Sequence, residues 1–246
     1  MANIVDKYRN TRSSVREAIK TVRANIQFAA MDKKIQTLVV TSPSASTGKS
    51  TIVAFLGVAF AEAGKSVLLV EADYRRPNLA NIFRQRPGNG LLQVLSGDYS
   101  LEDAIAETKQ EGLYILDTGG KVLSPAELVQ SKRFEKFVET ARKLFDVIIF
   151  DTPPMGAFIE PAVLASQADA TMLVLQPGRV QVSVAEATME QLKKANARVI
   201  GCVMNNCADV GSEHYYYYYR YYSQSQAENR KEIQIERPRP VGVERD

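Results

Sequence analysis

The stretch 41–51, Thr-Ser-Pro-Ser-Ala-Ser-Thr-Gly-Lys-Ser-Thr, restricts the possible folds of this chain of 246 residues more than any other. It follows one apolar run and precedes a longer one with the composition of a buried helix. A loop of small residues between a strand and a helix directs backbone amides and the positive helix end toward one point, where a phosphate can bind. Lys49 can then reach the β- and γ-phosphates, and the Ser50 hydroxyl can bind Mg²⁺. We expect a phosphate-binding loop here; because Pro43 stands where the strict pattern has glycine, a chance Gly-Lys-Ser in a flexible loop is the alternative.

Two further strand-like runs end in carboxylates. The run 66–71 ends in Glu71-Ala-Asp73 with Arg75 close behind, and a second apolar run ends at Asp151. Ligands bind at the carboxyl ends of parallel strands, so these acids are expected beside the phosphate-binding loop. Glu71 and Asp73 project to the same side of an extended chain, which suits holding Mg²⁺ and taking a proton from an incoming hydroxyl. Arg75 and Arg76 could steady phosphate oxygens. Asp151 is placed like the carboxylate that holds Mg²⁺ in P-loop NTPases. For the segment 71–73, the alternative is an acidic turn exposed to solvent.

Strand-like and helix-like segments alternate along most of the chain, which predicts an α/β fold with a mainly parallel β-sheet flanked by helices. The predicted strands are 35–40, 66–71, 112–116, 146–151, 170–176 and 197–205. The predicted helices are 13–30, 52–63, 134–144 and 182–196, with short helices and turns over 78–108. Ser124-Pro-Ala-Glu127 predicts a further helix start, with Ser124 as its N-cap. We expect one domain over residues 1–208 and a flexible tail over 209–246.

Composition narrows the class of protein. A net charge of +3 argues against a dedicated nucleic-acid binder. We find neither a signal peptide nor an apolar run of about 18 residues, so we expect a cytoplasmic protein without a membrane span. Two cysteines, Cys202 and Cys207, do not make a disulfide framework, and their spacing is not typical of a metal site.

Seven of the 11 tyrosines gather in the tail. They are Tyr215, Tyr216, Tyr217, Tyr218, Tyr219, Tyr221 and Tyr222. Such a run cannot bury one face as a helix or a strand, and as a folded element it would expose a large aromatic patch. One interpretation is a low-complexity surface that packs on a partner. The other is a set of phosphoryl acceptors, each gaining about −1.5 to −2 charge on modification, which a nucleotide-binding domain on the same chain favours.

The predicted helix 13–30 carries a polar strip formed by Glu17, Lys20 and Arg23, which are spaced by three. Val15, Ile19, Val22, Ile26 and Phe28 are expected to form its apolar side. The strip is either a solvated face with weak ion pairs or an interface with a neighbouring subunit, and the sequence alone favours the solvated face.

These motifs together resemble the bacterial tyrosine kinases of capsule and exopolysaccharide synthesis, a branch of the MinD/ParA-like P-loop ATPases. The resemblance covers residues 14–222 and rests on 42–51 as Walker A, 70–77 as Walker A′ and 147–154 as Walker B. The Ser-Pro-x-Glu-Leu segment at Ser124 and the tyrosine cluster also fit.

The resemblance implies transfer of phosphate from ATP to tyrosine in the presence of Mg²⁺. It implies an oligomeric ring in which each tail enters a neighbour's site. It also implies activation by a separate membrane adaptor of the polysaccharide co-polymerase type, which recruits the kinase to the inner face of the cell membrane. The expected catalytic residues are Lys49, Glu71, Asp73, Arg75 and Asp151, with Asp73 as the base. The expected nucleotide-binding residues are Ser44, Ala45, Ser46, Thr47, Gly48, Lys49, Ser50, Thr51 and, at the adenine, Asn205. The expected Mg²⁺ ligands are Ser50, Asp73 and Asp151, and Glu17, Lys20 and Arg23 are the expected oligomer interface.

The chain departs from the family pattern at three of these positions. Ser46 replaces a glycine, Glu71 replaces an aspartate, and Lys20 replaces an arginine that could form a bidentate ion pair. If position 46 requires a positive φ, serine hinders the loop there. Two other functions stay open: a MinD/ParA-type positioning or partitioning ATPase, which usually carries a lysine where Ser44 stands, and a non-enzymatic scaffold that binds nucleotide.

Overall fold

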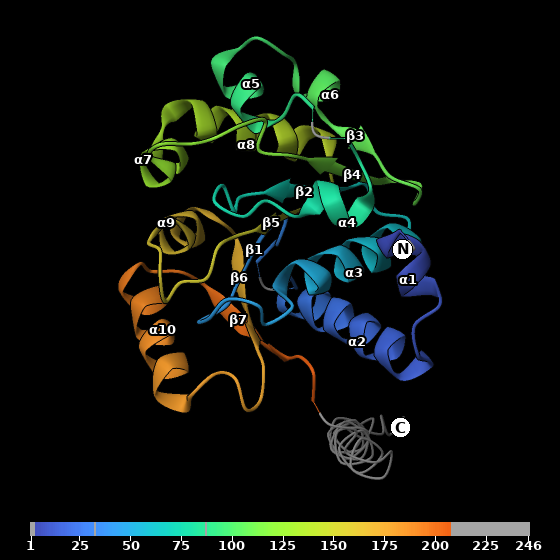
Figure 1. Ribbon diagram of the computed structural model, residues 1–246, viewed down its shortest axis with the longest axis vertical. Coiled ribbons are helices and arrows are strands. Elements are labelled where there is room, and N and C mark those ends of the chain that lie inside the picture. The colour runs from blue at the N-terminus through green and yellow to red at the C-terminus, as the bar shows by residue number, and fades with distance from the viewer. Residues whose placement is uncertain (1–2, 32, 87, 208–246) are drawn as a thin grey trace, which may run out of the picture. The chain divides into compact units, whose positions relative to one another are not determined.

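The computed structural model describes residues 3–31, 33–86 and 88–207, and residues up to 205 belong to one compact unit. A sheet of seven strands crosses this unit in the order β3-β4-β2-β5-β1-β6-β7 (Figure 1). All neighbouring strands are parallel except β3 and β4, which are antiparallel. The tail predicted from residue 209 and its tyrosines lie outside the described residues, so the tail and its boundary stay predictions.

Every strand predicted from an apolar run is present in the sheet. The strands are β1 (Thr37–Thr41), β2 (Val67–Glu71), β3 (Ala106–Glu107), β4 (Leu113–Leu116), β5 (Val147–Asp151), β6 (Ala170–Leu175) and β7 (Val199–Met204). In β1 and β2 every residue is buried, as expected for strands that are covered on both faces. Sequence reasoning missed β3, because a strand of two residues leaves no periodic signal.

Helices cover both faces of the sheet (Figure 1). One face carries α1 (Ile4–Arg9), α2 (Ser13–Ala29), α3 (Lys49–Glu62) and α4 (Leu79–Phe83), which share one hydrophobic core. The other carries α5 (Leu91–Ser96), α6 (Leu101–Ala104), α7 (Pro125–Gln130), α8 (Lys132–Leu144), α9 (Glu160–Gln167) and α10 (Val182–Lys194). All residues of α3 from Ile52 to Ala61 are buried, which confirms the prediction of a helix enclosed on all sides.

Two sequence-based details hold only in part. In α2, Ile19 and Ile26 are buried, but Val15 and Phe28 belong to the exposed side rather than to the predicted apolar face. Helix α7 does start after Ser124 with Pro125 at its first turn, yet the Ser124 side chain makes no capping hydrogen bond. Helices α1 and α9 were not predicted, because their apolar residues are too few to establish a helical period.

The central strands bring the predicted motifs to one edge of the sheet. Strand β5 lies between β2 and β1, so that Asp151 pairs in register with Glu71 on one side and with Val40 on the other. The segments that follow β1, β2 and β5 therefore leave the sheet side by side. This is the edge at which open α/β sheets bind their ligands.

Candidate functional site

The phosphate-binding loop joins the end of β1 to the start of α3. Gly48 precedes the helix in a left-handed conformation with φ +86°, and a Cβ there would lie 2.1 Å from Nδ2 of Asn205. Glycine is therefore required both by the backbone and by the neighbouring side chain. Ser46 has φ 59°, a left-handed conformation that glycine adopts without strain and serine does not, so the condition under which serine hinders the loop is met. Helix α3 begins at Lys49, and its first-turn amides have no partners within the helix.

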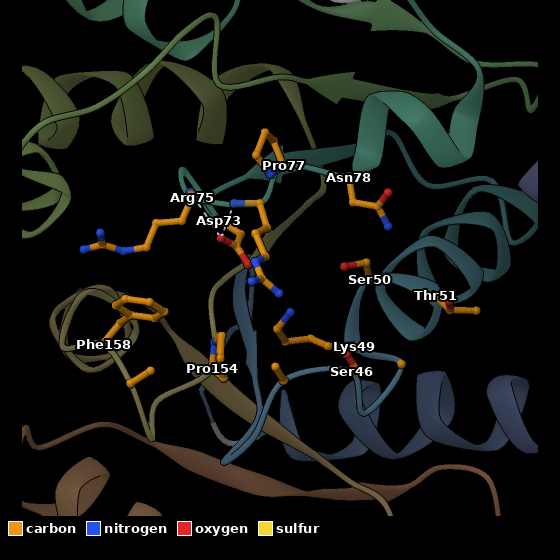
Figure 2. Close-up of a pocket in the computed structure, with 14 residues that line it drawn as sticks. Ser46, Lys49, Ser50, Thr51, Asp73, Arg75, Pro77, Asn78, Pro154 and Phe158 are labelled. Atoms are coloured by element: carbon orange, nitrogen blue, oxygen red, sulfur yellow. Dashed lines mark hydrogen bonds between the residues drawn. The ribbon is translucent and has the colours of Figure 1, made fainter.

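A cavity of about 620 Å³ opens beside this loop (Figure 2). Its walls come from the three segments that follow β1, β2 and β5. They include Ala45, Ser46, Gly48, Lys49, Ser50 and Thr51, then Asp73, Arg75, Arg76, Pro77 and Asn78, and finally Pro154, Ala157 and Phe158. Five of these were missed from the sequence: Pro77, Asn78, Pro154, Ala157 and Phe158. Pro154 and the residues after it could have been found, because the Pro-Pro pair follows a strand that ends in a functional acid.

Lys49 and Asp151 form a buried ion pair beneath the cavity. Nζ of Lys49 lies 3.3 Å from Oδ1 of Asp151, and the carboxylate side chain is 1% exposed. Burial raises the pKa of the Asp151 carboxyl, whereas Lys49 and Ser50 beside it act in the opposite direction. Neither oxygen of this carboxylate has a hydrogen-bond partner among the described residues, so Oδ2, which is not in the ion pair, can accept a further ligand.

Asp73 lies in the cavity between Lys49 and Arg75 (Figure 2). Its Oδ1 accepts hydrogen bonds from the backbone amides of Arg75 at 3.3 Å and Arg76 at 3.0 Å. These bonds fix the orientation of the carboxylate within the loop that follows β2. A half-buried carboxylate in a cavity beside a phosphate-binding loop can take a proton from a hydroxyl that comes within hydrogen-bond reach of it.

The Arg75 side chain turns away from the phosphate-binding loop. Its guanidinium donates to Oε1 of Glu160 at 2.7 Å and lies 4.2 Å from the centre of the Phe158 ring. Glu160 is buried, and nothing in the sequence around it indicated this partnership. In this arrangement Arg75 forms a wall of the cavity.

Glu71, which the sequence places among the expected catalytic residues, lies outside the cavity wall. The side chain is fully buried and does not line the cavity. Its two oxygens accept hydrogen bonds from the backbone amides of Asp73, Asn78 and Leu79 at 3.0, 2.6 and 2.9 Å. Burial and the nearby charge of Asp151 raise the pKa of Glu71 to about 8, and the amide hydrogen bonds oppose this rise. Glu71 therefore organises the turn that carries Asp73.

Three of the expected nucleotide-binding residues do not line the cavity. Asn205 donates a hydrogen bond from Nδ2 to the carbonyl of Thr47 at 2.8 Å. Ser44 accepts one at its carbonyl from the Ser42 hydroxyl at 2.8 Å. Thr47 is buried. These contacts shape the loop, and none of the three residues belongs to the cavity wall.

The residues expected at an oligomer interface divide into two groups. Lys20 donates to Glu17 at 2.8 Å on the exposed side of α2. Arg23 instead donates to the carbonyl of Ala59 in α3 at 2.7 Å, within the same chain. Glu17 and Lys20 are thus accessible, whereas Arg23 joins two helices of one subunit.

The cavity fits a nucleotide with Mg²⁺. Magnesium usually keeps several waters and takes one or two protein carboxylates together with phosphate oxygens. Ser50 and Asp73 line the cavity, and below it the Asp151 carboxylate has no hydrogen-bond partner among the described residues besides the ion pair of its Oδ1 with Lys49. Within the described residues no cluster of three or more His, Cys, Asp or Glu side chains could bind a metal by itself. The donor set therefore suits a metal held jointly with phosphates.

Comparisons with known proteins agree with this geometry. Residues 35–203 match the family model AAA_31, described as an AAA domain. Over 189 residues the chain is 35% identical to the tyrosine-protein kinase YwqD of Bacillus subtilis (strain 168), covering 77% of this chain and 80% of that protein.

Solved structures share the fold. The chimerical protein CapA2B2 has a TM-score of 0.77 and 29% identity, over 83% of this chain and 89% of that one. The septum site-determining protein MinD from Pyrococcus horikoshii OT3, complexed with Mg-ADP, has a TM-score of 0.57 and 27% identity, over 69% of this chain and 70% of that one. Among the helices that the structure describes, none is both long and apolar enough to cross a membrane.

Proposed function

The chain belongs to the bacterial tyrosine-protein kinases, and on that premise we propose that it transfers the γ-phosphoryl group of ATP to the tyrosines of its own tail. The acceptors in this proposal are the seven tyrosines between residues 215 and 222. A kinase domain and a dense set of acceptors on one chain make autophosphorylation the simplest use of both.

One observation carries this proposal: a single cavity contains both a phosphate-binding loop and a carboxylate placed to act as a base. Lys49 and Ser50 line one part of it and Asp73 another (Figure 2). An ATPase that acts on water has no need of a further open surface beside its base. Here Arg75 and Phe158 line the same cavity as Asp73 and also line a second, open hollow that adjoins it.

Each residue of the site has its own role in the proposed phosphoryl transfer. Asp73 takes the proton of the acceptor hydroxyl while the tyrosine oxygen forms a bond to the γ-phosphorus and the bond from that phosphorus to the ADP oxygen breaks. Lys49 neutralises negative charge on the transferred group, and the loop amides orient it. Ser50, Asp73 and Asp151 would hold Mg²⁺, which when bound neutralises charge on the β- and γ-phosphates. Glu71 acts through Asp73, because it holds the turn that carries it.

We further propose the cellular setting that the family resemblance implies. The kinase would act in the cytoplasm on capsule or exopolysaccharide synthesis, recruited to the membrane by a separate adaptor of the polysaccharide co-polymerase type. Subunits would assemble into a ring through α2. The exposed Glu17 and Lys20 support this role, whereas Arg23 already has a partner within the subunit.

The test uses the full chain with ATP and Mg²⁺. We expect phosphotyrosine on immunoblots and phosphate on the tail by mass spectrometry. Lys49→Met should abolish the signal, because it removes the charge that the transferred group requires. A chain with all seven tail tyrosines changed to phenylalanine should bind ATP as the unaltered chain does and gain no phosphotyrosine in the tail. A signal that is unchanged by Lys49→Met, or no signal even with an adaptor segment present, would contradict the proposal.

The similarity to MinD keeps a positioning ATPase as the second candidate. That function predicts dimers that form with ATP and dissociate on hydrolysis, without phosphotyrosine. Light scattering with ATP and with ADP, in parallel with the immunoblot, separates the two functions.

A further inference from the structure

Helix α9 places a further buried carboxylate beside the nucleotide cavity. Glu160 is the first residue of this helix, and its side chain is 6% exposed. A buried carboxylate is costly unless a cation or hydrogen-bond donors neutralise it. The guanidinium of Arg75, in the loop that follows β2, donates to Oε1 of Glu160 at 2.7 Å. This ion pair therefore joins the segment after β5 to the segment after β2, two of the three segments that form the cavity.

Arg75 is held at both of its ends. Its backbone amide donates to Oδ1 of Asp73 at 3.3 Å. Its guanidinium is bound by Glu160 and lies 4.2 Å from the centre of the Phe158 ring. In Figure 2 the side chain of Arg75 extends toward Phe158 and away from Lys49. A single residue thus links the buried carboxylate of α9 to the proposed base.

Two buried acids hold different parts of the turn that carries the base. Glu71 accepts backbone amides at the two ends of this turn. The amides in its middle, those of Arg75 and Arg76, go to the Asp73 carboxylate instead. Both arginines are exposed, so packing in the core does not fix them. The contact of Arg75 with Glu160 is therefore what ties the middle of the turn to the rest of the fold.

The ion pair also keeps a cation away from the base. A guanidinium and a carboxylate two residues apart on a turn can form a bidentate pair, which would occupy the oxygens that have to accept the proton. In the structure Glu160 neutralises the Arg75 guanidinium, and the Phe158 ring lies against it, so that the side chain is held in the other direction. The Asp73 carboxylate consequently stays available in the cavity wall.

We propose that Glu160 is a positioning residue for the phosphoryl transfer. By binding the Arg75 guanidinium, it keeps the Arg75 amide on Asp73 and leaves the Asp73 carboxylate free to act as the base. This inference rests on the proposed kinase function and adds a residue that lies outside the motifs at 42–51, 70–77 and 147–154. Glu160 contacts neither reactant and acts through Arg75.

Glu160→Gln in the full-length chain tests this role, because glutamine keeps the size of the side chain and removes its charge. The rate of tyrosine phosphorylation at saturating ATP and Mg²⁺ should fall about tenfold, since a small displacement of the base slows the transfer. The Kd for ATP should stay the same, because the phosphate-binding loop is untouched. Glu186→Gln is the matched control: it removes an exposed acid of α10 that lines neither hollow, and both values should equal those of the unaltered chain. Equal rates for Glu160→Gln and the control would overturn the proposal, and so would a loss of ATP affinity that accounts for the slower rate.

A double-mutant cycle shows whether Glu160 acts through Arg75. Arg75→Met keeps an unbranched apolar side chain and removes the guanidinium. In that background Glu160→Gln should change the phosphorylation rate by less than about twofold, because the cation that Glu160 neutralises is already absent. The full effect of Glu160→Gln in the Arg75→Met background would show that the two residues act independently and would overturn the proposal.

Exchange of backbone amides with water, measured by NMR on the full-length chain, does not depend on turnover. In Glu160→Gln the amides of Arg75 and Arg76 should exchange several times faster than in the unaltered chain, because the turn is no longer held at its middle. The amide of Leu79, which Glu71 holds, should not change. If the unaltered chain forms no phosphotyrosine but the exchange changes as expected, the kinase function fails while the positioning contact stands. Unchanged exchange at Arg75 and Arg76 would overturn the positioning role itself.

Discussion

Ser46 shows how a single residue limits the site. Its φ of 59° lies in the left-handed region, which costs an L side chain roughly 1–2 kcal/mol relative to glycine. Its side chain is exposed, so the serine has no packing that offsets this cost. The serine at position 46 should therefore lower the stability of the folded chain by a measurable amount.

We expect Ser46→Gly to raise the free energy of unfolding by about 1 kcal/mol, since relief of backbone strain exceeds the entropy that glycine adds to the unfolded chain. Urea denaturation measures the change. Ser46→Ala is the matched control: it removes the hydroxyl but keeps Cβ and therefore the strain. If both variants have the same stability, strain at this position is not the cause.

At the scale of elements, the turn between β2 and α4 depends on one buried acid. Glu71 accepts the amides of Asp73, Asn78 and Leu79, which span the turn from the end of β2 to the first residue of α4. A carboxyl group keeps acceptor capacity at both oxygens even when it is protonated, whereas the nitrogen of a carboxamide only donates. The turn that carries Asp73 is therefore specific for an acid at this position.

We expect Glu71→Gln to lower the free energy of unfolding by about 1–2 kcal/mol, because at least one buried amide loses its acceptor. The rate of tyrosine phosphorylation should fall with it, while ATP affinity should change little. Glu62→Gln, at the exposed end of α3, is the control and should match the unaltered chain in both measurements. Normal stability of Glu71→Gln would show that the turn does not need this carboxylate.

A second polar network joins elements at the opposite edge of the sheet. Arg142 of α8 donates two hydrogen bonds of 2.8 and 3.0 Å to Asp169. Asp169 also accepts hydrogen bonds from the backbone amides of Gln36 and Thr37, at the start of β1. Although burial by itself raises the pKa of Asp169, the hydrogen bonds from Arg142, Thr37 and Gln36 lower it to about 2. The folded state therefore holds this carboxylate ionised more strongly than the unfolded chain does.

The low pKa of Asp169 makes the stability of the fold depend on pH. A depressed pKa contributes stability above the unfolded value, near pH 4, and that contribution is lost as the pH falls toward about 2. We expect Asp169→Asn to be less stable by about 1–2 kcal/mol at pH 7, a value reduced for partial exposure, with the difference shrinking below pH 4. Thermal unfolding from pH 7 to pH 2 measures this. Glu190→Gln removes an exposed acid and should follow the unaltered chain throughout; a difference for Asp169→Asn that is constant with pH would contradict the linkage.

At the scale of the whole molecule, one cavity joins the segments after three neighbouring strands. A ligand that contacts all three segments stabilises only the folded arrangement, so binding and global stability are linked. The Lys49–Asp151 pair belongs to this linkage, since it lies beneath the cavity and connects α3 with β5.

Mg²⁺ and ATP at about 100 times the dissociation constant should add about 2.7 kcal/mol of stability and raise Tm by about 5–10 °C. A chelator should remove most of the shift, because the carboxylates and phosphates need the metal between them. Lys49→Met should lose the shift as well. Differential scanning calorimetry with and without chelator is the measurement, and a shift that survives both changes would place the nucleotide elsewhere.

The sequence predicted the α/β class, the parallel strands and the loop at 41–51, because each depends on local patterning: continuous apolar runs, small residues before a helix, acids at strand ends. It also predicted that Lys49, Asp73 and Asp151 would lie together, since parallel strands end at the same edge. The short strand β3 and helix α9 have too few residues to give a periodic signal.

Only the tertiary structure decided what the neighbours of these residues do. Glu71 and Asp73 are two residues apart and of one chemical type, yet the first is buried under backbone amides and the second faces the cavity. The contacts of Arg75 with Glu160, and of Asn205 with Thr47, join residues that are 85 and 158 positions apart. Local sequence does not encode such contacts, because they arise where separate strands and helices pack. The sequence by itself determined that a phosphate site exists, and packing determined which side chains reach it.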